Sequence, residues 1–227
     1  MKTEEEGKGV NGIIGLHLKP LDNLEIAAQW QLNTKMKLER SFPLEADLTE
    51  SGNLSSSTTG DDSPYRVDAE VSRRIFPQDA NRKDIPGIIN VGVKYGASAD
   101  IDLEFGFNYY QNEQAKWGRD DEGNKTGEYY SNSFEAGLSG EWKQDWGVLS
   151  AGYLYSNASV APEGQGYLTY SLPSHSVAAG GRYVLTEAMS MDVGVLHVMY
   201  QSDKNAAETL EYRKGATGVV VGFDYAW

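Results

Sequence analysis

Apolar and polar residues alternate with a period of two along most of this chain. The clearest example is the segment IDLEFGFNYY, in which apolar or aromatic residues alternate with acidic, small and polar ones. A period of two places alternate side chains on opposite faces, so the segment is predicted to be a β-strand with one apolar face. The C-terminal segment GATGVVVGFDYAW repeats the pattern and ends on an aromatic residue.

The same alternation recurs almost without interruption, and no stretch longer than two turns shows the 3.6-residue period of an amphipathic helix. The chain is therefore predicted to be all-β. Nine strands are expected, at residues 11–20, 23–33, 88–95, 101–110, 133–142, 148–156, 174–184, 191–200 and 215–227.

The strands of a soluble β-sandwich show the same alternation of apolar and polar residues. The composition of the polar face and the lengths of the connections therefore have to distinguish a sandwich from a transmembrane barrel. Glycine, serine, asparagine and carboxylates dominate the polar face here, which is typical of a wet lumen. The connections alternate between short and long, as the turns and external loops of outer-membrane barrels do; the longest covers residues 41–85. These two features favour an antiparallel transmembrane β-barrel. Its expected interfacial aromatic girdle is Trp142, Trp146, Tyr183, Tyr225 and Trp227.

The composition of the chain excludes several classes of function and site. The net charge of -13 argues against nucleic-acid binding, which needs a basic face, and the absence of cysteine excludes disulfides and thiolate metal sites. No apolar run approaches the ~20 residues of a membrane-spanning helix. The N-terminal MKTEEEGKG lacks the basic start and apolar core of a signal peptide.

Several charged residues fall on the polar face of the expected strands and are predicted to line the pore, where they form a solvated or ion-paired interior. The pore-lining candidates are Lys94, Asp102, Glu104, Glu135, Arg182, Asp192 and Asp224. No catalytic residue, metal ligand or cofactor site is expected. His175 lies between two serines, but adjacent strand residues point to opposite faces, and the acidic stretch RDDEGNKTGE lacks the regular ligand spacing of a calcium loop.

The number of strands raises a question of parity. A single-chain bacterial barrel has an even number of strands with both chain ends on the periplasmic side, and nine do not fit. Making a tenth strand of YRVDAEVSRRI would break the alternation of short and long connections. We therefore expect residues 1–227 to be a single partial barrel domain, the C-terminal part of a longer protein whose N-terminal strands, hatch and signal peptide are absent.

The order of these segments resembles the C-terminal portion of the FadL/TodX family of outer-membrane transporters for hydrophobic compounds. The resemblance rests on a strand, a turn with Lys19, Pro20, Asp22 and Leu24, a return strand, a long loop, and a strand with Pro86, Gly92 and Tyr95. It implies a barrel of about fourteen strands, with an N-terminal hatch in the lumen.

The resemblance also implies a function: passive uptake of long-chain fatty acids or aromatic hydrocarbons across the outer membrane of a Gram-negative-type bacterium. The expected partners are outer-membrane lipids, a hydrophobic small-molecule substrate, and the barrel-assembly machinery acting through the C-terminal aromatic strand. The chain alone is not expected to be competent for transport. Two alternatives stay open: a barrel enzyme of the protease or phospholipase kind, and a structural or adhesive barrel.

Overall fold

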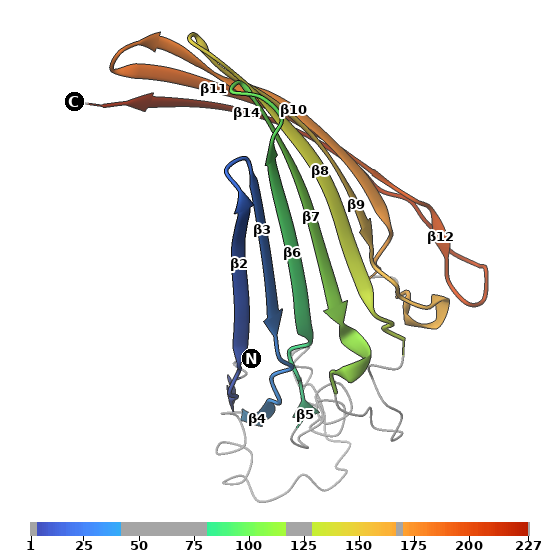
Figure 1. Cartoon of the computed structure of the whole chain (residues 1–227). Coiled ribbons are helices and arrows are strands. Elements are labelled where there is room, and N and C mark those ends of the chain that lie inside the picture. The colour runs from blue at the N-terminus through green and yellow to red at the C-terminus, as the bar shows by residue number, and fades with distance from the viewer. Residues whose placement is uncertain (1–3, 42–80, 117–128, 167–169, 227) are drawn as a thin grey trace, which may run out of the picture. The chain divides into compact units, whose positions relative to one another are not determined.

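A computed structural model describes four stretches of the chain, and Figure 1 traces them from the N-terminus to the C-terminus. They are residues 4–41, 81–116, 129–166 and 170–226. The chain divides into two compact units, which are treated separately below. The larger unit covers residues 11–33, 86–114 and 129–227, and the smaller covers residues 1–10, 34–85 and 115–128.

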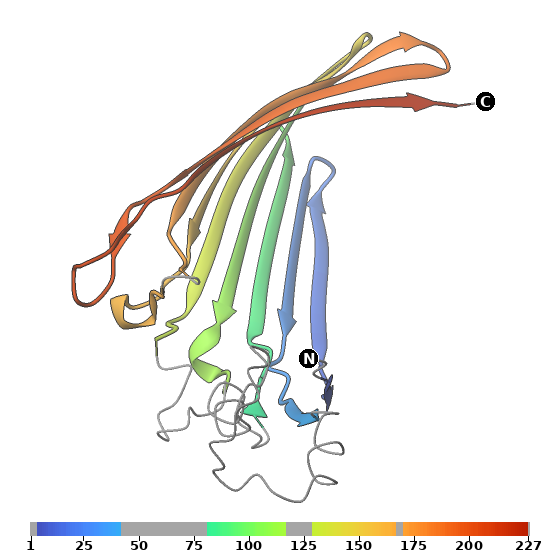
Figure 2. The same ribbon diagram turned by 180° about the vertical axis from the view of Figure 1, so that it is seen from behind.

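The larger unit is one antiparallel sheet of nine strands, and this confirms the prediction of nine alternating segments. Its order is β14-β11-β10-β9-β8-β7-β6-β3-β2, so strands that follow one another along the chain also lie side by side (Figures 1 and 2). The strands are β2 (Ile13–Leu21), β3 (Leu24–Gln31), β6 (Gly87–Gly96), β7 (Ile101–Gln111), β8 (Ser133–Gln144), β9 (Gly147–Asn157), β10 (Ser174–Thr186), β11 (Met189–Tyr200) and β14 (Gly215–Tyr225).

The register of the strands joins the apolar residues into one continuous face. Residues opposite each other on paired strands point to the same side, so each row across the sheet belongs to one face. One row crosses all nine strands: Leu16, Ala28, Val91, Phe107, Ala136, Tyr155, His175, Met199 and Gly215. We call the side of this row the outer face and the opposite side the inner face.

The connections alternate in length, as the sequence predicts. Short turns join β2 to β3, β6 to β7, β8 to β9 and β10 to β11, and the other connections are long. We call the two ends of the sheet the short-turn end and the long-loop end. The described parts of the long connections include two short 3-10 helices, η1 (Asn112–Gln114) and η2 (Pro162–Gly164), and a hairpin of β12 (Asp203–Lys204) and β13 (Glu211–Tyr212).

Two of the long connections are tied together by Gln165, which is 6% exposed. Its side-chain amide nitrogen donates to the Ser171 carbonyl at 2.9 Å and to Asp203 Oδ2 at 3.2 Å. Tyr170 stacks on Tyr212, with ring centroids 4.8 Å apart. Residues 158–166 and 170–173 therefore pack together with the β12–β13 hairpin at the long-loop end.

The nine-stranded sheet twists strongly, so that β2 and β14 run in different directions in both views (Figures 1 and 2). Within the described residues these two strands are its edges, and each pairs on one side only. The described part of the chain contains no helix that is long and apolar enough to cross a membrane.

The smaller unit contains a three-stranded sheet that the sequence analysis did not predict. Its strands are β1 (Glu4–Lys8), β4 (Lys37–Ser41) and β5 (Asn81–Arg82), in the order β1-β4-β5. Asp84, 3% exposed, joins three segments of this unit: its carboxylate accepts the backbone N–H groups of Met36 and Lys116, each at 3.1 Å. The rejected tenth strand, YRVDAEVSRRI, lies outside the described residues.

Gly147 gives a test of the turn between β8 and β9. Its φ is +147°, a conformation that side-chain-bearing residues rarely adopt, and an added Cβ would collide with the carbonyl of Arg182 on β10. We expect Gly147→Ala to lower the free energy of unfolding by about 1–3 kcal/mol or more. Urea unfolding of the detergent-folded chain, followed by tryptophan fluorescence, measures the change.

Gly106→Ala is the matched control for this experiment. Gly106 lies within β7, and a Cβ added there meets no atom within 4 Å. We expect this variant to match or slightly exceed the stability of the unmodified chain, because alanine loses less backbone entropy on folding. Equal effects of the two substitutions would contradict the conformational explanation.

Candidate functional site

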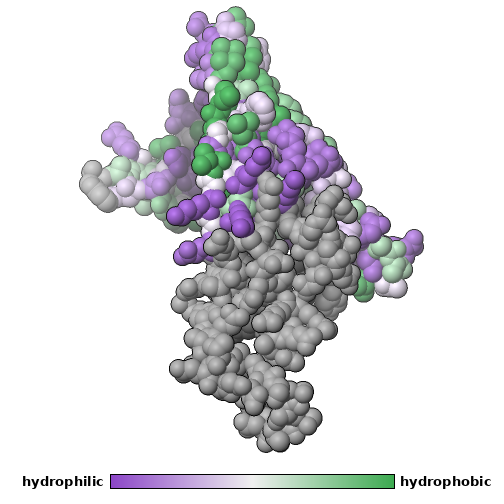
Figure 3. All heavy atoms as spheres, turned by 90° about the horizontal axis from the view of Figure 1, so that it is seen from below, coloured by the Kyte–Doolittle hydropathy of each residue, from purple (hydrophilic) through white to green (hydrophobic). Residues whose placement is uncertain are grey.

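The outer face is apolar, and within the described part of the larger unit no protein layer packs against it. In the described part of the chain only three hydrophobic residues are buried, and none of them belongs to the nine strands; they are Ala115, Leu172 and Tyr212. Outer-face side chains are instead widely exposed, with Leu138 at 59% and Phe223 at 65%. Figure 3 shows hydrophobic residues gathered in patches that are separate from the hydrophilic ones. A soluble sandwich would bury this face, whereas lipid covers it in a transmembrane barrel.

Three of the predicted girdle residues lie together at the short-turn end of the sheet. The rings of Trp142 and Trp146 meet edge to face with centroids 6.2 Å apart, and Trp146 lies 6.1 Å from Tyr183. Tyr225 lies at the same end on β14, opposite Met189, and Trp227 lies outside the described residues. The position of these aromatics fits a lipid–water interface, and the girdle role stays a prediction.

A second polar–aromatic cluster occupies the outer face near the long-loop end. Tyr153 Oη lies 2.7 Å from His175 Nδ1, Gln201 Nε2 lies 3.1 Å from His175 Nε2, and the Tyr155 ring is 5.0 Å from the imidazole. Rings with a polar group are favoured where an apolar surface meets water. This cluster was not predicted, and it lies at the opposite end of the outer face from Trp142.

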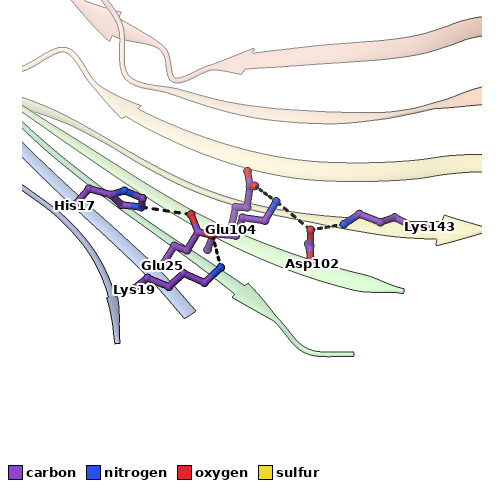
Figure 4. Close-up of polar contacts among 7 residues, drawn as sticks. His17, Lys19, Glu25, Asp102, Glu104 and Lys143 are labelled. Atoms are coloured by element: carbon purple, nitrogen blue, oxygen red, sulfur yellow. Dashed lines mark hydrogen bonds and ion pairs between the residues drawn. The ribbon is translucent and has the colours of Figure 1, made fainter. Parts of the chain in front are cut away.

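The inner face carries ion pairs that run from strand to strand (Figure 4). On β2 and β3, Glu25 accepts from Lys19 at 3.4 Å and lies 3.4 Å from His17. On β6, β7 and β8, Asp102 is shared by Lys94 at 3.0 Å and Lys143 at 2.6 Å. Lys94 also contacts Glu104 at 3.4 Å, so each of these cations is neutralised by a neighbouring strand.

Arg182 contacts one of its carboxylate partners through two hydrogen bonds. Its Nε and Nη2 atoms donate to the two carboxylate oxygens of Asp192, each at 2.9 Å, and Nη2 also donates to Asp224 Oδ2 at 2.6 Å. The guanidinium of β10 thereby joins β11 and β14. Two parallel hydrogen bonds to one carboxylate fix both distance and orientation, as a lysine does not.

Glu135 is held differently, by neutral donors near the long-loop end of the inner face. Its carboxylate accepts hydrogen bonds from Tyr110 Oη at 2.9 Å, from Asn108 Nδ2 at 3.3 Å and from Ser156 Oγ at 3.3 Å. These partners come from β7 and β9, on either side of the strand that carries Glu135. The cluster therefore links β7, β8 and β9 through hydrogen bonds from neutral donors.

The structure places all seven predicted pore-lining residues on the inner face, and it brings six of them into the ion pairs described above. Whether they line a pore stays a prediction. Lys143, the closest partner of Asp102, was missed, although it has the same strand parity as Glu135. Tyr110 and Ser156 were missed as well, because a hydrogen bond between strands depends on the register, which the alternation alone does not give.

The described residues were also compared with the arrangements that metal binding or histidine-based catalysis would need. They contain no group of three histidine, aspartate or glutamate side chains placed to hold a metal ion. His197 Nδ1 lies 2.8 Å from Thr217 Oγ1 on the outer face, and His17 pairs with Glu25. The acidic stretch considered for calcium, residues 119–128, lies outside the described residues.

Known structures share this arrangement of strands. The P. putida toluene transporter TodX is 12% identical and superimposes with a TM-score of 0.53, covering 97% of this chain and 50% of that one. The sheet has the fold of part of a FadL-type barrel. The match to the CymD monoaromatic hydrocarbon channel (11% identity, TM-score 0.51) covers 96% of this chain and 51% of the CymD chain. The match to a Pseudomonas aeruginosa FadL homologue (14% identity, TM-score 0.51) covers 84% of this chain and 44% of the homologue.

The chain thus spans about half the length of these FadL-type structures. No protein-family model matches it, and no curated protein does. The resemblance stated from the sequence is confirmed at the level of the fold, where low sequence identity leaves strand order and register as the shared features. The predicted class, an all-β antiparallel sheet of outer-membrane barrel type, is confirmed by the same comparison.

The Glu135 cluster yields a stability prediction. Tyr110→Phe removes the shortest hydrogen bond to the carboxylate, and we expect it to lower the free energy of unfolding by about 1 kcal/mol, the usual value for one such bond. Urea unfolding in detergent measures the change. Tyr109→Phe removes a hydroxyl from the adjacent, outward-facing residue of the same strand and is expected to have a smaller effect; the reverse order would contradict the assignment.

Proposed function

We propose that this chain forms part of the wall of an outer-membrane channel through which hydrophobic small molecules enter a Gram-negative-type bacterium by diffusion. The observation that carries the proposal is the contrast between the two faces of one sheet. The outer face is apolar and exposed, which suits contact with lipid, and the inner face carries charged ladders that suit contact with water.

The similar structures support transport more than catalysis. Two of them are a monoaromatic hydrocarbon channel and a toluene transporter. An enzyme would need a nucleophile and a base within reach of each other. In the described part of the chain, the three histidines contact Glu25, Tyr153, Gln201 and Thr217, and none of these contacts joins a hydroxyl, an imidazole and a carboxylate in one relay.

The proposal includes closure of the sheet by further strands. Among the described residues, β2 and β14 each leave one row of backbone N–H and C=O groups without a strand partner. Unpaired groups of this kind cost several kcal/mol each in hydrocarbon. The sheet is therefore proposed as one part of a larger barrel, with outer-membrane lipids around it and with β14 as the aromatic strand that the barrel-assembly machinery recognises.

Single cysteines test the orientation of the wall, because the native chain contains none. The chain is exported with a cleavable signal peptide, and isolated outer membranes are treated with a water-soluble or a lipophilic maleimide. We expect Gly106→Cys, on the inner face of β7, to react with the water-soluble reagent. Phe105→Cys, the adjacent outward-facing residue, is expected to react only with the lipophilic one.

Each outcome of this experiment bears on the proposal. Equal reactivity of both cysteines with the water-soluble reagent would mean a sheet with water on both faces and would overturn the membrane-wall function. Absence of the chain from the outer-membrane fraction would overturn it as well.

A further inference from the structure

The inner face of the sheet is not uniform, because in its middle rows the polar character ends near β8, whereas Arg182, Asp192 and Asp224 continue it on the later strands at the short-turn end. One row runs through Glu25, Lys94, Glu104 and Ser139 and continues on the later strands as Gly152, Ala178, Leu196 and Gly218. The neighbouring row through Asp102 and Glu141 changes in the same way and continues as Ser150, Gly180, Gly194 and Val220. The inner-face residues that follow define an apolar strip on β9, β10, β11 and β14: Val148, Leu154, Ala178, Leu196, Val198 and Val220.

Several of these side chains are exposed, although they are aliphatic and face the same side as the ion pairs. Leu196 is 42% exposed and Val220 is 67% exposed. Val220 lies diagonally across from Leu196, one row along the strand, because Gly218 is the direct partner of Leu196. Aliphatic surface that faces water is stabilised by any apolar occupant that removes it from water.

A hollow lies over the apolar strip. Its volume is about 780 Å³, and Val148, Leu196 and Val220 line it together with several residues that have small side chains or none. The charged residues Glu104, Glu141, Arg182 and Asp192 also line it, so the charged end of the inner face forms part of the hollow. At Gly218 an added Cβ would meet no atom within 4 Å, so the absence of a side chain leaves open space there. The volume lies within the roughly 300–1,000 Å³ of pockets that bind small organic molecules.

Charge decides which small molecules suit this hollow. The short-turn end of the inner face carries three cations, Lys94, Lys143 and Arg182, against five carboxylates, Asp102, Glu104, Glu141, Asp192 and Asp224. Two negative charges are therefore left uncompensated. The four cations on the inner face of the described sheet, Lys19 included, each contact a carboxylate, so an anionic headgroup finds no unpaired cation there.

We propose that the apolar strip is a contact site for uncharged hydrophobic solutes, and that the anionic end of the strip rejects amphiphiles with a carboxylate headgroup. The inference rests on the proposed channel function and narrows its substrate class to neutral hydrocarbons. A solute binds by covering Leu196 and Val220 in the hollow. A carboxylate of the same length loses this contact, because its head meets Asp192, Asp224 and Glu141 with Arg182 already occupied.

Photolabelling of the full chain in outer membranes tests the proposal. The probes are a neutral phenylalkyl diazirine and its carboxylate analogue of equal length, and labelled peptides are mapped by mass spectrometry. We expect the neutral probe to label inner-face positions of β11 and β14, and the carboxylate to label them about tenfold less, a factor that corresponds to about 1.4 kcal/mol.

Residues of β11 and β14 provide matched variants. Leu196→Thr makes the strip more polar and is expected to reduce labelling of the inner-face positions about fivefold, because it removes apolar contact surface. Val221→Thr changes an outward-facing residue of β14, next to Val220, to a side chain of equal size, and it is expected to leave inner-face labelling unchanged. Asp192→Asn combined with Asp224→Asn frees the guanidinium and is expected to raise labelling by the carboxylate probe.

Three results would overturn the proposal. They are equal labelling by the two probes, labelling that does not respond to Leu196→Thr, and a Leu196→Cys variant that stays unreactive to water-soluble maleimide while Gly106→Cys reacts. The last result would mean that protein, such as a plug inside the barrel, covers the strip. Failure of Gly106→Cys to react would instead overturn the channel function itself, so the two failures are distinguishable.

Discussion

The ladder of backbone hydrogen bonds between nine antiparallel strands is the constraint on which the other features depend. Within the sheet it satisfies backbone groups that would be costly to expose to hydrocarbon. It also fixes the register, and the register turns a simple alternation along each strand into two continuous faces. A slip of one residue in one pair, such as β7 against β8, would move Phe105 and Phe107 to the charged side and Glu104 to the apolar side.

The register also explains why the charged residues of the inner face are tolerated. Each long cationic side chain reaches a carboxylate on a neighbouring strand, as Lys143 of β8 reaches Asp102 of β7 and Arg182 of β10 reaches Asp192 of β11. Side chains as exposed as these contribute modestly to stability in water. Their larger effect is on the properties of the wall: the ladder leaves an excess of negative charge, and its pairs occupy the cations that would otherwise attract anionic solutes.

Much of the fold could be predicted from the sequence, because alternation and connection length are local signals. Segments such as residues 101–110 show their strand period without any knowledge of their neighbours, and the segment KQDWG, residues 143–147, indicates a tight turn. The ion pairs of Lys94 and Arg182 were expected in outline, since these are cations on a face rich in carboxylates. Their partners were not assigned, because the register between strands is a long-range property.

The features that the sequence analysis missed share one physical reason. Asp84 joins Met36 and Lys116, and Gln165 joins Ser171 and Asp203; each contact links segments whose proximity no local pattern indicates. The apolar strip was missed for a related reason. Leu196 and Val220 break the alternation only mildly on their own strands, and they become a surface only when β9, β10, β11 and β14 lie side by side.

The two halves of the inner face then have complementary consequences for a molecule that moves along it. Over β3 to β8 the wall offers charges and hydrogen-bonding groups to water, so a hydrophobic solute gains nothing there. Over β9 to β14 the middle rows of the same face offer aliphatic side chains and open space above Gly218, so a hydrophobic solute that leaves the membrane loses less apolar contact there. Strong binding would hinder release, whereas a shallow and exposed strip lowers the barrier to passage without trapping the solute. A wall that combines a wet side with a weakly apolar side is therefore suited to diffusion of neutral hydrophobic molecules, and its excess of carboxylates makes it less suited to their anionic relatives.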